Sequence, residues 1–385
     1  MANLSAVVGV GQIRSRTKHA DKSIAGMVRV AADRALEDAG VTWNDIEAVI
    51  IGKAPDFFEG VLQPELYLAE ALGAVGKPML RVHTAGSVGG STGVVAASYV
   101  QSGAFKRVLV LCFEKQSEGN AMWALSPKMP FSPHINAGAG GYFAPAMRLY
   151  IEKYHADPDT GYMVAVKDRL NALKNPYAHL TIEDISIEMV KESPMLWEPI
   201  RYLESCPSSD GACAMVIADE SLVKDSPNKP AWILGTSVRS EPTMYAHRDT
   251  VSPPSIRDCA KDVYRQAGIT NPRREIDMAE LYVPFSWYEP MWLEATGLAE
   301  QGEGWKMTME GITAIDGDMP VNCSGGVISS NPIGASGLIR FAEAALQVRA
   351  MAGEHQIEGA KTAIGHAMGG GAQFFAMWVV GAEKP

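Results

Sequence analysis

The same order of helices and strands occurs twice along this chain, and this internal repeat limits the possible folds more than any other feature. An amphipathic helix over 23–38 ends at Ala39-Gly40-Val41-Thr42, where glycine can take the left-handed conformation that closes a helix. A second helix over 255–266 ends in the same way at Ala267-Gly268-Ile269-Thr270. Two copies of one unit predict two similar lobes rather than unrelated domains.

The segments that follow these helices repeat as well. Residues 48–51 are an apolar, β-branched run typical of a buried strand, and residues 276–282 take the same place in the second half. Farther along, Gly90-Ser91-Thr92-Gly93 and Gly334-Ala335-Ser336-Gly337 each open a helix. Because alternating strands and helices favour mixed sheets covered by helices, the sequence predicts an α/β fold built from two related halves.

One long segment has no counterpart in the second half. We predict an N-terminal half made of residues 1–120 and 203–228, an inserted loop or cap region over 121–202, and a C-terminal half over 229–385. The inserted region is rich in Pro, Met, Tyr and Trp and contains a helical stretch over 161–173. We expect it to cover the functional site.

The charge and the hydropathy pattern exclude several kinds of partner. With 34 Lys and Arg against 44 Asp and Glu, the formal net charge is −10, whereas nucleic-acid binding requires clustered positive charge. No apolar run approaches the roughly 18 residues of a membrane-spanning helix, and the N-terminus lacks the basic and apolar regions of a signal peptide. We therefore expect no nucleic-acid partner and no membrane association.

The cysteines bear on metal binding and on the cellular compartment. They are odd in number and include no C-x-x-C pair, so we predict no metal site in this chain. Sparse, unpatterned thiols fit a reducing compartment, which favours a cytoplasmic protein. The five cysteines are Cys112, Cys206, Cys213, Cys259 and Cys323.

Two glycine-rich turns are candidates for binding an anion. Thr84-Ala85-Gly86-Ser87 and Asn331-Pro332-Ile333-Gly334 each lie between a strand-like segment and a helix. Such turns aim backbone N–H groups at one point and can stabilise negative charge, although they also serve simply as packing turns. Neither turn is a phosphate loop, because the G-x-x-x-x-G-K-[ST] pattern is absent.

Two further residues are candidates for proton transfer. His366 follows an apolar strand start and precedes Gly369-Gly370-Gly371, a run of glycines that indicates close approach of the backbone to a ligand. Tyr282 lies at the carboxyl end of a predicted strand, where the functional groups of open α/β sheets gather. The alternatives are a structural histidine and a buried core tyrosine.

Several motifs together resemble the thiolase superfamily over essentially the whole chain. Pro320-Val321-Asn322-Cys323-Ser324-Gly325-Gly326 and the segment 331–337 resemble the family's N-x-x-G-G and G-H-P-x-G-A-x-G signatures. Residues 207–212 look like its strand motif after the insertion, and 164–168 resembles the sterol-carrier-type branch. The resemblance implies a duplicated fold of two βαβαβαββ halves in five αβαβα layers, with an inserted loop domain.

The departures from the family pattern are as informative as the matches. Gly86 occupies the position at which thiolases carry a nucleophilic cysteine, and glycine cannot form an acyl-enzyme. Asn331 replaces the histidine of G-H-P, and an amide can donate a hydrogen bond but cannot move a proton near pH 7. Tyr282 falls near a third catalytic motif of the family, and His366 falls near the last one.

The resemblance therefore implies a thioester pocket that lacks a nucleophile. Such a pocket suits retro-aldol cleavage of a β-hydroxyacyl-CoA, with coenzyme A carried by the substrate and no cofactor held by the chain. In this scheme Tyr282 is the acid or base at the β-hydroxyl, Asn331 holds the thioester oxygen, and His366 assists proton transfer or completes the oxyanion site. Further contacts to the substrate or its oxyanion are expected from Gly86, Ser87, Asn322, Gly369 and Gly370.

The pattern resembles bacterial steroid side-chain aldolases of the lipid-transfer-protein-like kind. This resemblance implies a steroid-like acyl group, a homodimer and a small partner protein with a zinc ribbon and an OB-fold. Two alternatives stay open at the level of the sequence. The first is an acyltransferase of the thiolase type that uses another cysteine, such as Cys323. The second is a non-catalytic carrier or scaffold that binds acyl-CoA.

Overall fold

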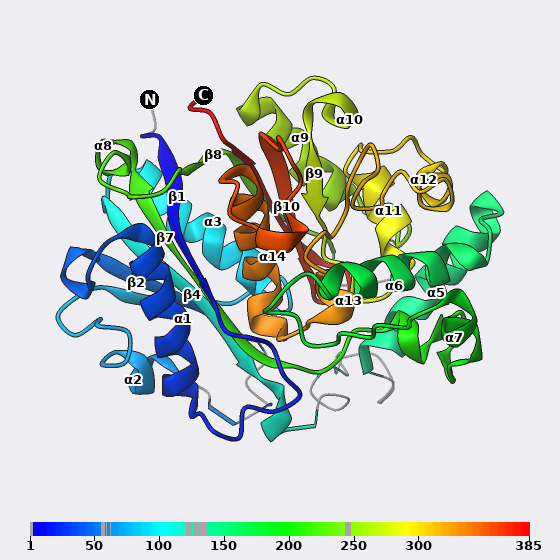
Figure 1. Ribbon diagram of the computed structural model, residues 1–385, viewed down its shortest axis with the longest axis horizontal. Helices are drawn as coiled ribbons and strands as arrows, with labels where there is room; N and C mark the ends of the chain where they lie inside the picture. Colours follow the sequence, from blue (N-terminus) through cyan, green and yellow to red (C-terminus); the bar gives the residue numbers. More distant parts are fainter. Residues whose placement is uncertain are drawn as a thin grey trace.

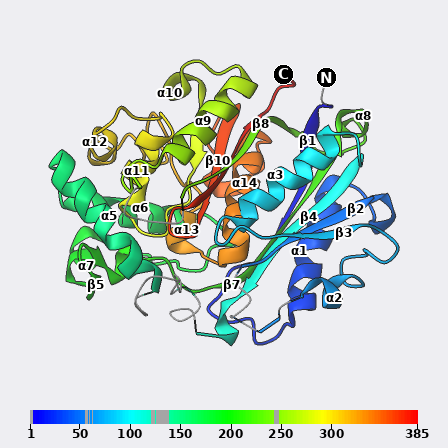
Figure 2. The same cartoon turned by 180° about the vertical axis from the view of Figure 1, so that it is seen from behind.

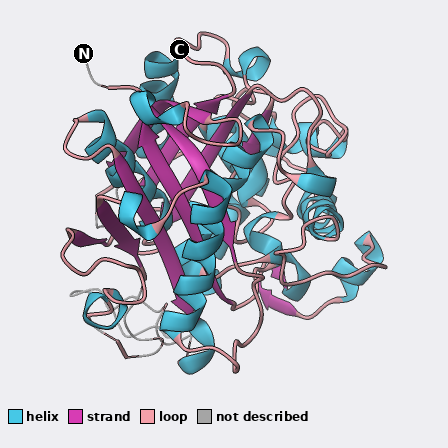
Figure 3. Cartoon of the chain, turned by 60° about the vertical axis from the view of Figure 1, so that its left-hand side comes forward, coloured by secondary structure: helices cyan, strands magenta, loops and turns pink. Residues whose placement is uncertain are grey.

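The computed structural model describes residues 3–54, 58, 60–61, 63–120, 125, 138–242 and 248–385. Nine of the described strands form one mixed sheet in the order β3-β2-β4-β7-β1-β8-β11-β10-β9. Figure 3 shows the strands of this sheet with helices packed around them. The strands of the first half are β1 (Ser5–Gln12), β2 (Ala48–Gly52), β3 (Met79–Val82), β4 (Arg107–Lys115) and β7 (Asp210–Asp219). Those of the second half are β8 (Ala231–Ser240), β9 (Met278–Glu280), β10 (Thr362–Gly369) and β11 (Phe374–Gly381).

The sheet repeats the same topology on either side of its centre, where β1 pairs with β8. Moving outward from β1 the order is β7, β4, β2 and β3, and moving outward from β8 it is β11, β10 and β9. The directions match as well, because β7 and β11 are antiparallel to both of their neighbours, whereas the β2–β4 and β9–β10 pairs are parallel. At the place equivalent to β3, Val321 makes one parallel bridge with Ala279. The predicted duplication is confirmed.

Helices cover the sheet and also fill the space between its halves. On the outer faces, α1 (Ile24–Ala39) packs on β1 and β7, and α9 (Pro254–Ala267) packs on β8 and β11. Between the halves, α3 (Val88–Gln101) and α14 (Ile333–Val348) pack against each other and against strands of both sides (Figure 2). These are the five layers that the resemblance to thiolases implies.

The residues at the helix ends explain why the repeat can be recognised in the sequence. The Ser23 hydroxyl accepts the N–H of Gly26 at 3.1 Å and begins α1. Gly40 and Gly268 take φ angles of 66° and 71° and end α1 and α9, as the repeated glycines predict.

One predicted helix boundary was wrong. We expected Gly90-Ser91-Thr92-Gly93 to open this helix, but α3 begins earlier, at Val88. The glycines before Thr92 are therefore helical, and they are needed for close packing. A Cβ atom on Gly89 would lie 2.4 Å from the Leu338 nitrogen, and one on Gly90 would lie 2.6 Å from the Ala367 Cβ atom. Small residues here let α3 and α14 approach each other closely.

The segment between β4 and β7 forms a helical layer beside the second half of the sheet (Figure 1). Its described elements are α5 (Gly138–Tyr154), α6 (Asp159–Ala172), α7 (Ile187–Glu192) and the hairpin of β5 (Met195–Trp197) and β6 (Ile200–Arg201). Helix α6 matches the predicted helical stretch and packs on α12 (Gly304–Met309) and α13 (Gly326–Ser329). The exact division of the chain into three regions stays a prediction.

The remaining short elements lie in connecting loops. They are α2 (Glu65–Leu68), α8 (Glu220–Val223), α10 (Pro272–Glu275), α11 (Tyr288–Ala295), η1 (Trp43–Asp45), η2 (Gln116–Glu118), η3 (Tyr202–Glu204) and η5 (Gly353–His355). Within the described ranges, no helix has both the length and the apolar character that crossing a bilayer would require.

Candidate functional site

A cavity of about 290 Å³ lies where the two central helices begin and where the inserted region meets both halves. The turn before α3 supplies one wall, and the segment before α14 supplies another. Helix α5 of the inserted region contributes Ala139, Tyr142 and Phe143. The other lining residues are His83, Ala85, Gly86, Leu125, Cys206, Tyr282, Pro284, Phe285, Asn331, Ile333, Met368, Gly369, Gly370, Gly371 and Gln373.

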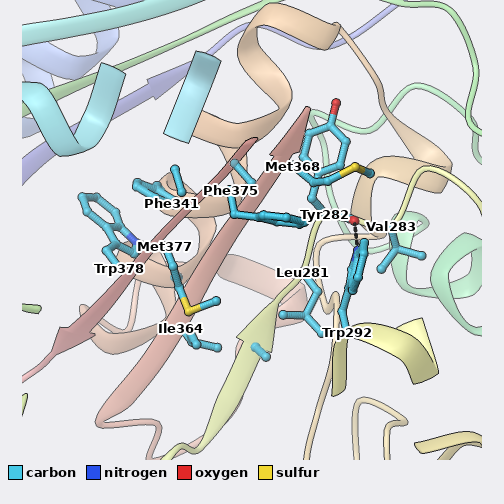
Figure 4. Close-up of a cluster of buried hydrophobic side chains, with 14 of the residues drawn as sticks. Leu281, Tyr282, Val283, Trp292, Phe341, Ile364, Met368, Phe375, Met377 and Trp378 are labelled. Carbon is cyan, nitrogen blue, oxygen red and sulfur yellow. Dashed lines mark hydrogen bonds between the residues drawn. The ribbon is translucent and has the colours of Figure 1, made fainter. Parts of the chain in front are cut away.

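The backbone around Tyr282 is held by side chains rather than by the sheet. The Leu281 N–H donates to Asn322 Oδ1 at 2.8 Å, and the Tyr282 N–H donates to His366 Nδ1 at 3.3 Å. The Trp292 indole N–H donates to the Tyr282 carbonyl oxygen at 3.0 Å (Figure 4). Buried backbone groups require such partners, so the chain can leave the sheet here. The strand β9 therefore ends two residues earlier than predicted.

The Tyr282 side chain reaches the cavity from this anchored backbone. Figure 4 shows the ring beside Met368, with its hydroxyl directed away from the packed side chains. The hydroxyl lies 3.5 Å from Asn331 Oδ1. Burial raises the pKa of Tyr282 above its ordinary value, and the nearby Cys206 adds to the shift. The phenol is therefore protonated at neutral pH and acts as a donor rather than as a base.

Asn331 is tethered at nearly every polar atom. Its Oδ1 accepts the Ser336 hydroxyl at 2.8 Å, and its backbone N–H donates to the Ser209 hydroxyl at 3.1 Å. Its carbonyl oxygen accepts the Gln116 amide at 2.6 Å. The remaining contact is an N–H from Nδ2 to Cys206 Sγ at 3.1 Å. Since sulfur is a weak acceptor, a ligand oxygen in the cavity would compete well for this N–H.

Sequence analysis did not single out Cys206, yet this is the cysteine in the cavity lining. Burial raises its pKa to about 11, although the Asn331 N–H acts in the opposite direction. It is therefore a neutral thiol near pH 7. Cys323, the alternative nucleophile considered above, is fully buried and does not line the cavity. The one sequence signal for Cys206 was its place just before the motif at 207–212.

Gly86, which the resemblance to thiolases aligns with the family's nucleophilic cysteine, lines the cavity. A Cβ atom there would meet the Gly369 Cα atom and the Met368 oxygen at 3.4 Å, and Ile333 Cγ2 at 3.9 Å. These are ordinary contact distances, so packing does not require glycine at position 86. By contrast, a Cβ atom on Gly369 would lie 2.2 Å from the Ser87 nitrogen, so the β10 end needs glycine to approach this turn.

The structure brings together five of the predicted site residues and separates three. Tyr282, Asn331, Gly86, Gly369 and Gly370 line the cavity.

Three predicted residues lie behind the wall instead. His366 is fully buried beside the Trp292 and Phe375 rings, and burial lowers its pKa to about 3. The Ser87 hydroxyl donates to the Thr84 carbonyl oxygen at 2.7 Å, and Asn322 is used in holding the chain before Tyr282. His366 therefore holds the backbone of Tyr282 and lies outside the described lining of the cavity.

The cavity lining also includes His83, which we did not predict as a site residue from the sequence. It follows β3 directly, and the residue is exposed as well as part of the cavity lining. A position just after a strand end is the signal that could have identified it.

Comparison with known proteins places this geometry in context. The thiolase C-terminal domain-like family matches residues 237–382. The chain is 29% identical over 375 residues to an acetyl-CoA acetyltransferase of Methanothermobacter thermautotrophicus, covering 95% of this chain and 96% of that protein. It is 28% identical over 397 residues to sterol carrier protein 2 of Homo sapiens, covering 97% of this chain and 72% of that protein.

The fold is shared with a solved structure named Ltp2-ChsH2(DUF35) aldolase. The TM-score is 0.87, the sequence identity is 24%, and the match covers 99% of this chain and 98% of the other.

Proposed function

This chain belongs to the thiolase superfamily, in its sterol-carrier-type branch, and we propose that it is an acyl-CoA lyase that cleaves a C–C bond by a retro-aldol route. One observation carries the proposal. The cavity presents a protonated Tyr282 and the Asn331 amide, whereas Gly86 offers no nucleophile although a Cβ atom would fit there at ordinary contact distances. An aldolase in the same fold supports the reaction class.

The thioester oxygen is the first group that the cavity would stabilise. The Asn331 Nδ2 N–H donates to Cys206 Sγ, a weak acceptor, at 3.1 Å, and can turn to an enolate oxygen. The first turns of α3 and α14 flank the cavity, and helix N-termini favour negative charge. One such donor contributes on the order of 3–4 kcal/mol to a developing oxyanion.

The reaction then requires one proton to move from the β-hydroxyl to the α-carbon. Loss of the hydroxyl proton turns the C–O bond into a carbonyl, and the α–β bond breaks to leave the thioester enolate. The Tyr282 phenol, kept protonated by burial, supplies the proton to the enolate carbon. The products are a ketone or aldehyde and a shortened acyl-CoA.

The apolar walls support a bulky hydrocarbon as the acyl group. Phe143, Phe285, Ile333 and Met368 line the cavity beside the polar residues. Together with the sterol-carrier relatives, this lining supports our proposal of a steroid-like acyl group with a branched side chain. Cleavage would then serve steroid side-chain breakdown.

We extend the proposal to the quaternary structure and the location. The strand β3 ends the sheet order, and Leu80 on it is 41% exposed. The neighbouring helix α2, which packs on β3, exposes Leu66 and Tyr67 as well. Open apolar strand edges tend to pair, so we propose a homodimer through this edge. The aldolase structure is named for Ltp2 together with ChsH2(DUF35), which supports a second protein component here. We propose that this component is the small zinc-ribbon and OB-fold partner that the sequence resemblance implies. All five cysteines are free, which fits the cytoplasm.

A second candidate function follows from Cys206, whose sulfur lies in the cavity next to Asn331. In this version Cys206 forms an acyl-enzyme and free coenzyme A accepts the acyl group, as in an acyltransferase. Its raised pKa of about 11 weighs against this role, because the thiolate is the nucleophile.

A turnover assay separates these functions. The purified chain, with and without a DUF35-type partner, is given a β-hydroxyacyl-CoA with a branched apolar chain, and products are read by mass spectrometry. The lyase predicts a ketone or aldehyde and a shortened acyl-CoA without free coenzyme A. Cleavage only after free coenzyme A is added would establish the acyltransferase, and saturable binding without cleavage would establish a carrier.

A further inference from the structure

We infer that His83 is the base that removes the β-hydroxyl proton, an inference that rests on the proposed lyase function. The retro-aldol route needs a proton acceptor as well as the donor Tyr282. His83 lines the same cavity as Tyr282, Asn331 and Gly86 and comes from the opposite half of the molecule. Its place at the solvent-exposed end of β3 allows it to exchange a proton with water.

The other titratable groups of the described lining are poor acceptors near neutral pH. Burial raises the pKa of Tyr142 to about 12 and that of Cys206 to about 11, and it also raises the pKa of Tyr282. All three therefore hold their protons. His366 lies behind the wall, and its low pKa makes it a weak base that nothing in the cavity reaches. Histidine is the side chain that ordinarily exchanges a proton in this pH range.

The turn that carries His83 is held by hydrogen bonds between its own residues and the start of α3. The Thr84 hydroxyl donates to Ser91 Oγ at 2.7 Å, and the Thr84 carbonyl oxygen accepts the Ser87 hydroxyl at 2.7 Å. Ala85 takes a left-handed φ of 51°. The turn also packs closely against the end of β10. A Cβ atom on Gly369 would lie 2.2 Å from the Ser87 nitrogen, so only glycine fits there. A base on such a turn keeps its position relative to Tyr282, which is what proton transfer needs.

The described residues near His83 include side chains of both charges. Its own strand carries Arg81, and α2, which packs on β3, carries Glu65. The strand β2 and the first turn of α3 carry no charged residue. Lys53, just after β2, faces Glu114 across 3.6 Å. On the cavity side, the titratable groups among the described residues are the neutral phenols and thiol above and Arg248, which donates to the Gly371 carbonyl oxygen at 2.9 Å.

The proposed step balances as follows. The His83 imidazole takes the β-hydroxyl proton, and the O–H electron pair becomes the π bond of the new carbonyl. The α–β bond breaks, its electron pair forms the thioester enolate, and Tyr282 protonates the α-carbon. The imidazolium then returns a proton to the tyrosinate, directly or through solvent at the cavity mouth.

The variant His83→Asn tests this assignment in the full-length protein with its partner. We expect kcat/KM to fall by about 100-fold at pH 7, the acid limb of the pH profile to disappear, and added imidazole to restore part of the rate. Binding of the substrate and the melting temperature should stay unchanged. The matched control is His155→Asn, because His155 is exposed, lies outside the cavity and has a φ of 50° that asparagine tolerates.

Wild-type turnover with an unchanged acid limb in His83→Asn would overturn the inference. Should that variant fold poorly, His83→Gln applies the same criterion. If the wild-type protein itself releases no carbonyl product, the proposed lyase function fails instead, so the two failures are distinguishable.

Discussion

The two glycine-rich turns before α3 and α14 occupy equivalent places in the repeated halves but present different chemistry. The first places Gly86 at the cavity, where a side chain would fit but none exists. The second places Asn331 there and fixes it through Ser336, Ser209 and Gln116. The fold thus keeps both turns as helix starts. In the proposed mechanism, the donor to the thioester oxygen, Asn331, comes from the second turn, and Tyr282 lies nearby.

This difference shows that the two halves share the backbone geometry of the turns but not the side chains that the turns place at the cavity. In the first half, the turn contributes backbone and the flanking His83. In the second half, the polar side chains are held by networks that reach across the molecule. Changes in the second half should therefore affect turnover most, and changes in the first half should separate effects of space from effects of chemistry.

The largest effect is expected from Tyr282→Phe. It removes the proton donor and keeps the ring, the packing and the backbone hydrogen bonds to His366 and Trp292. We expect kcat to fall by about 100- to 10,000-fold with an unchanged melting temperature. Steady-state kinetics and thermal denaturation measure both quantities. Full turnover in this variant would show that Tyr282 is not the proton donor.

The next effect concerns the amide of Asn331. Asn331→Leu keeps the approximate volume and removes the N–H that we assign to the thioester oxygen, so we expect kcat to fall by about 100- to 1,000-fold. Ser336 retains the Pro332 carbonyl oxygen, 3.2 Å away, as a partner.

The matched control for Asn331 is Ser336→Ala. It loosens the amide without removing its N–H, so the loss should be about 10-fold at most. Equal losses in the two variants would show that the amide acts only as a structural element.

Gly86 and Gly369 meet at the cavity, and substitutions of these two glycines should differ in their effect on stability. Gly369→Ala places a Cβ atom 2.2 Å from the Ser87 nitrogen and should destabilise the protein by about 1–3 kcal/mol. Gly86→Ala adds a Cβ atom at ordinary contact distances, so its stability should stay within about 0.5 kcal/mol of the wild type.

Thermal denaturation compares the two glycine variants directly. An equal loss of stability in both would mean that position 86 also requires glycine for packing. In that case the missing nucleophile would be a consequence of space rather than of chemistry.

The smallest effect is expected from Cys206 near neutral pH. With a pKa raised to about 11, its alkylation by iodoacetamide should be slow at pH 7 and should accelerate about tenfold per pH unit up to pH 10. Mass spectrometry of the modified peptide measures the rate, and Cys206→Ser is the control for other sites. A rate that reaches a plateau near pH 7 would indicate an activated nucleophile and favour the acyltransferase.

Most of the fold could be predicted from the sequence because its signals are local. The αL glycines Gly40 and Gly268 and the apolar strands each depend on neighbouring residues, and the repeat supplied them twice. The start of α3 could not be predicted in this way. Gly89 and Gly90 look like turn residues, and only the contact with α14 explains them as helical.

The site was less predictable because tertiary contacts decide which side chains reach the cavity. His366 and Met368 lie on the same face of β10, but Trp292, more than 70 residues earlier, covers the first and leaves the second in the lining. Cys206 reaches the cavity because its N–H pairs with the Pro284 carbonyl oxygen at 2.9 Å. Neither contact can be inferred from the spacing of the residues in the sequence.

The most direct test of the account follows the proton and the enzyme mass in one reaction. The protein cleaves a β-hydroxyacyl-CoA in D₂O without free coenzyme A, and both the product and the intact protein are analysed by mass spectrometry. The account predicts one deuterium at the α-carbon of the shortened acyl-CoA and no mass added to the protein. A protein mass increased by the acyl group, and abolished by Cys206→Ser, would contradict it.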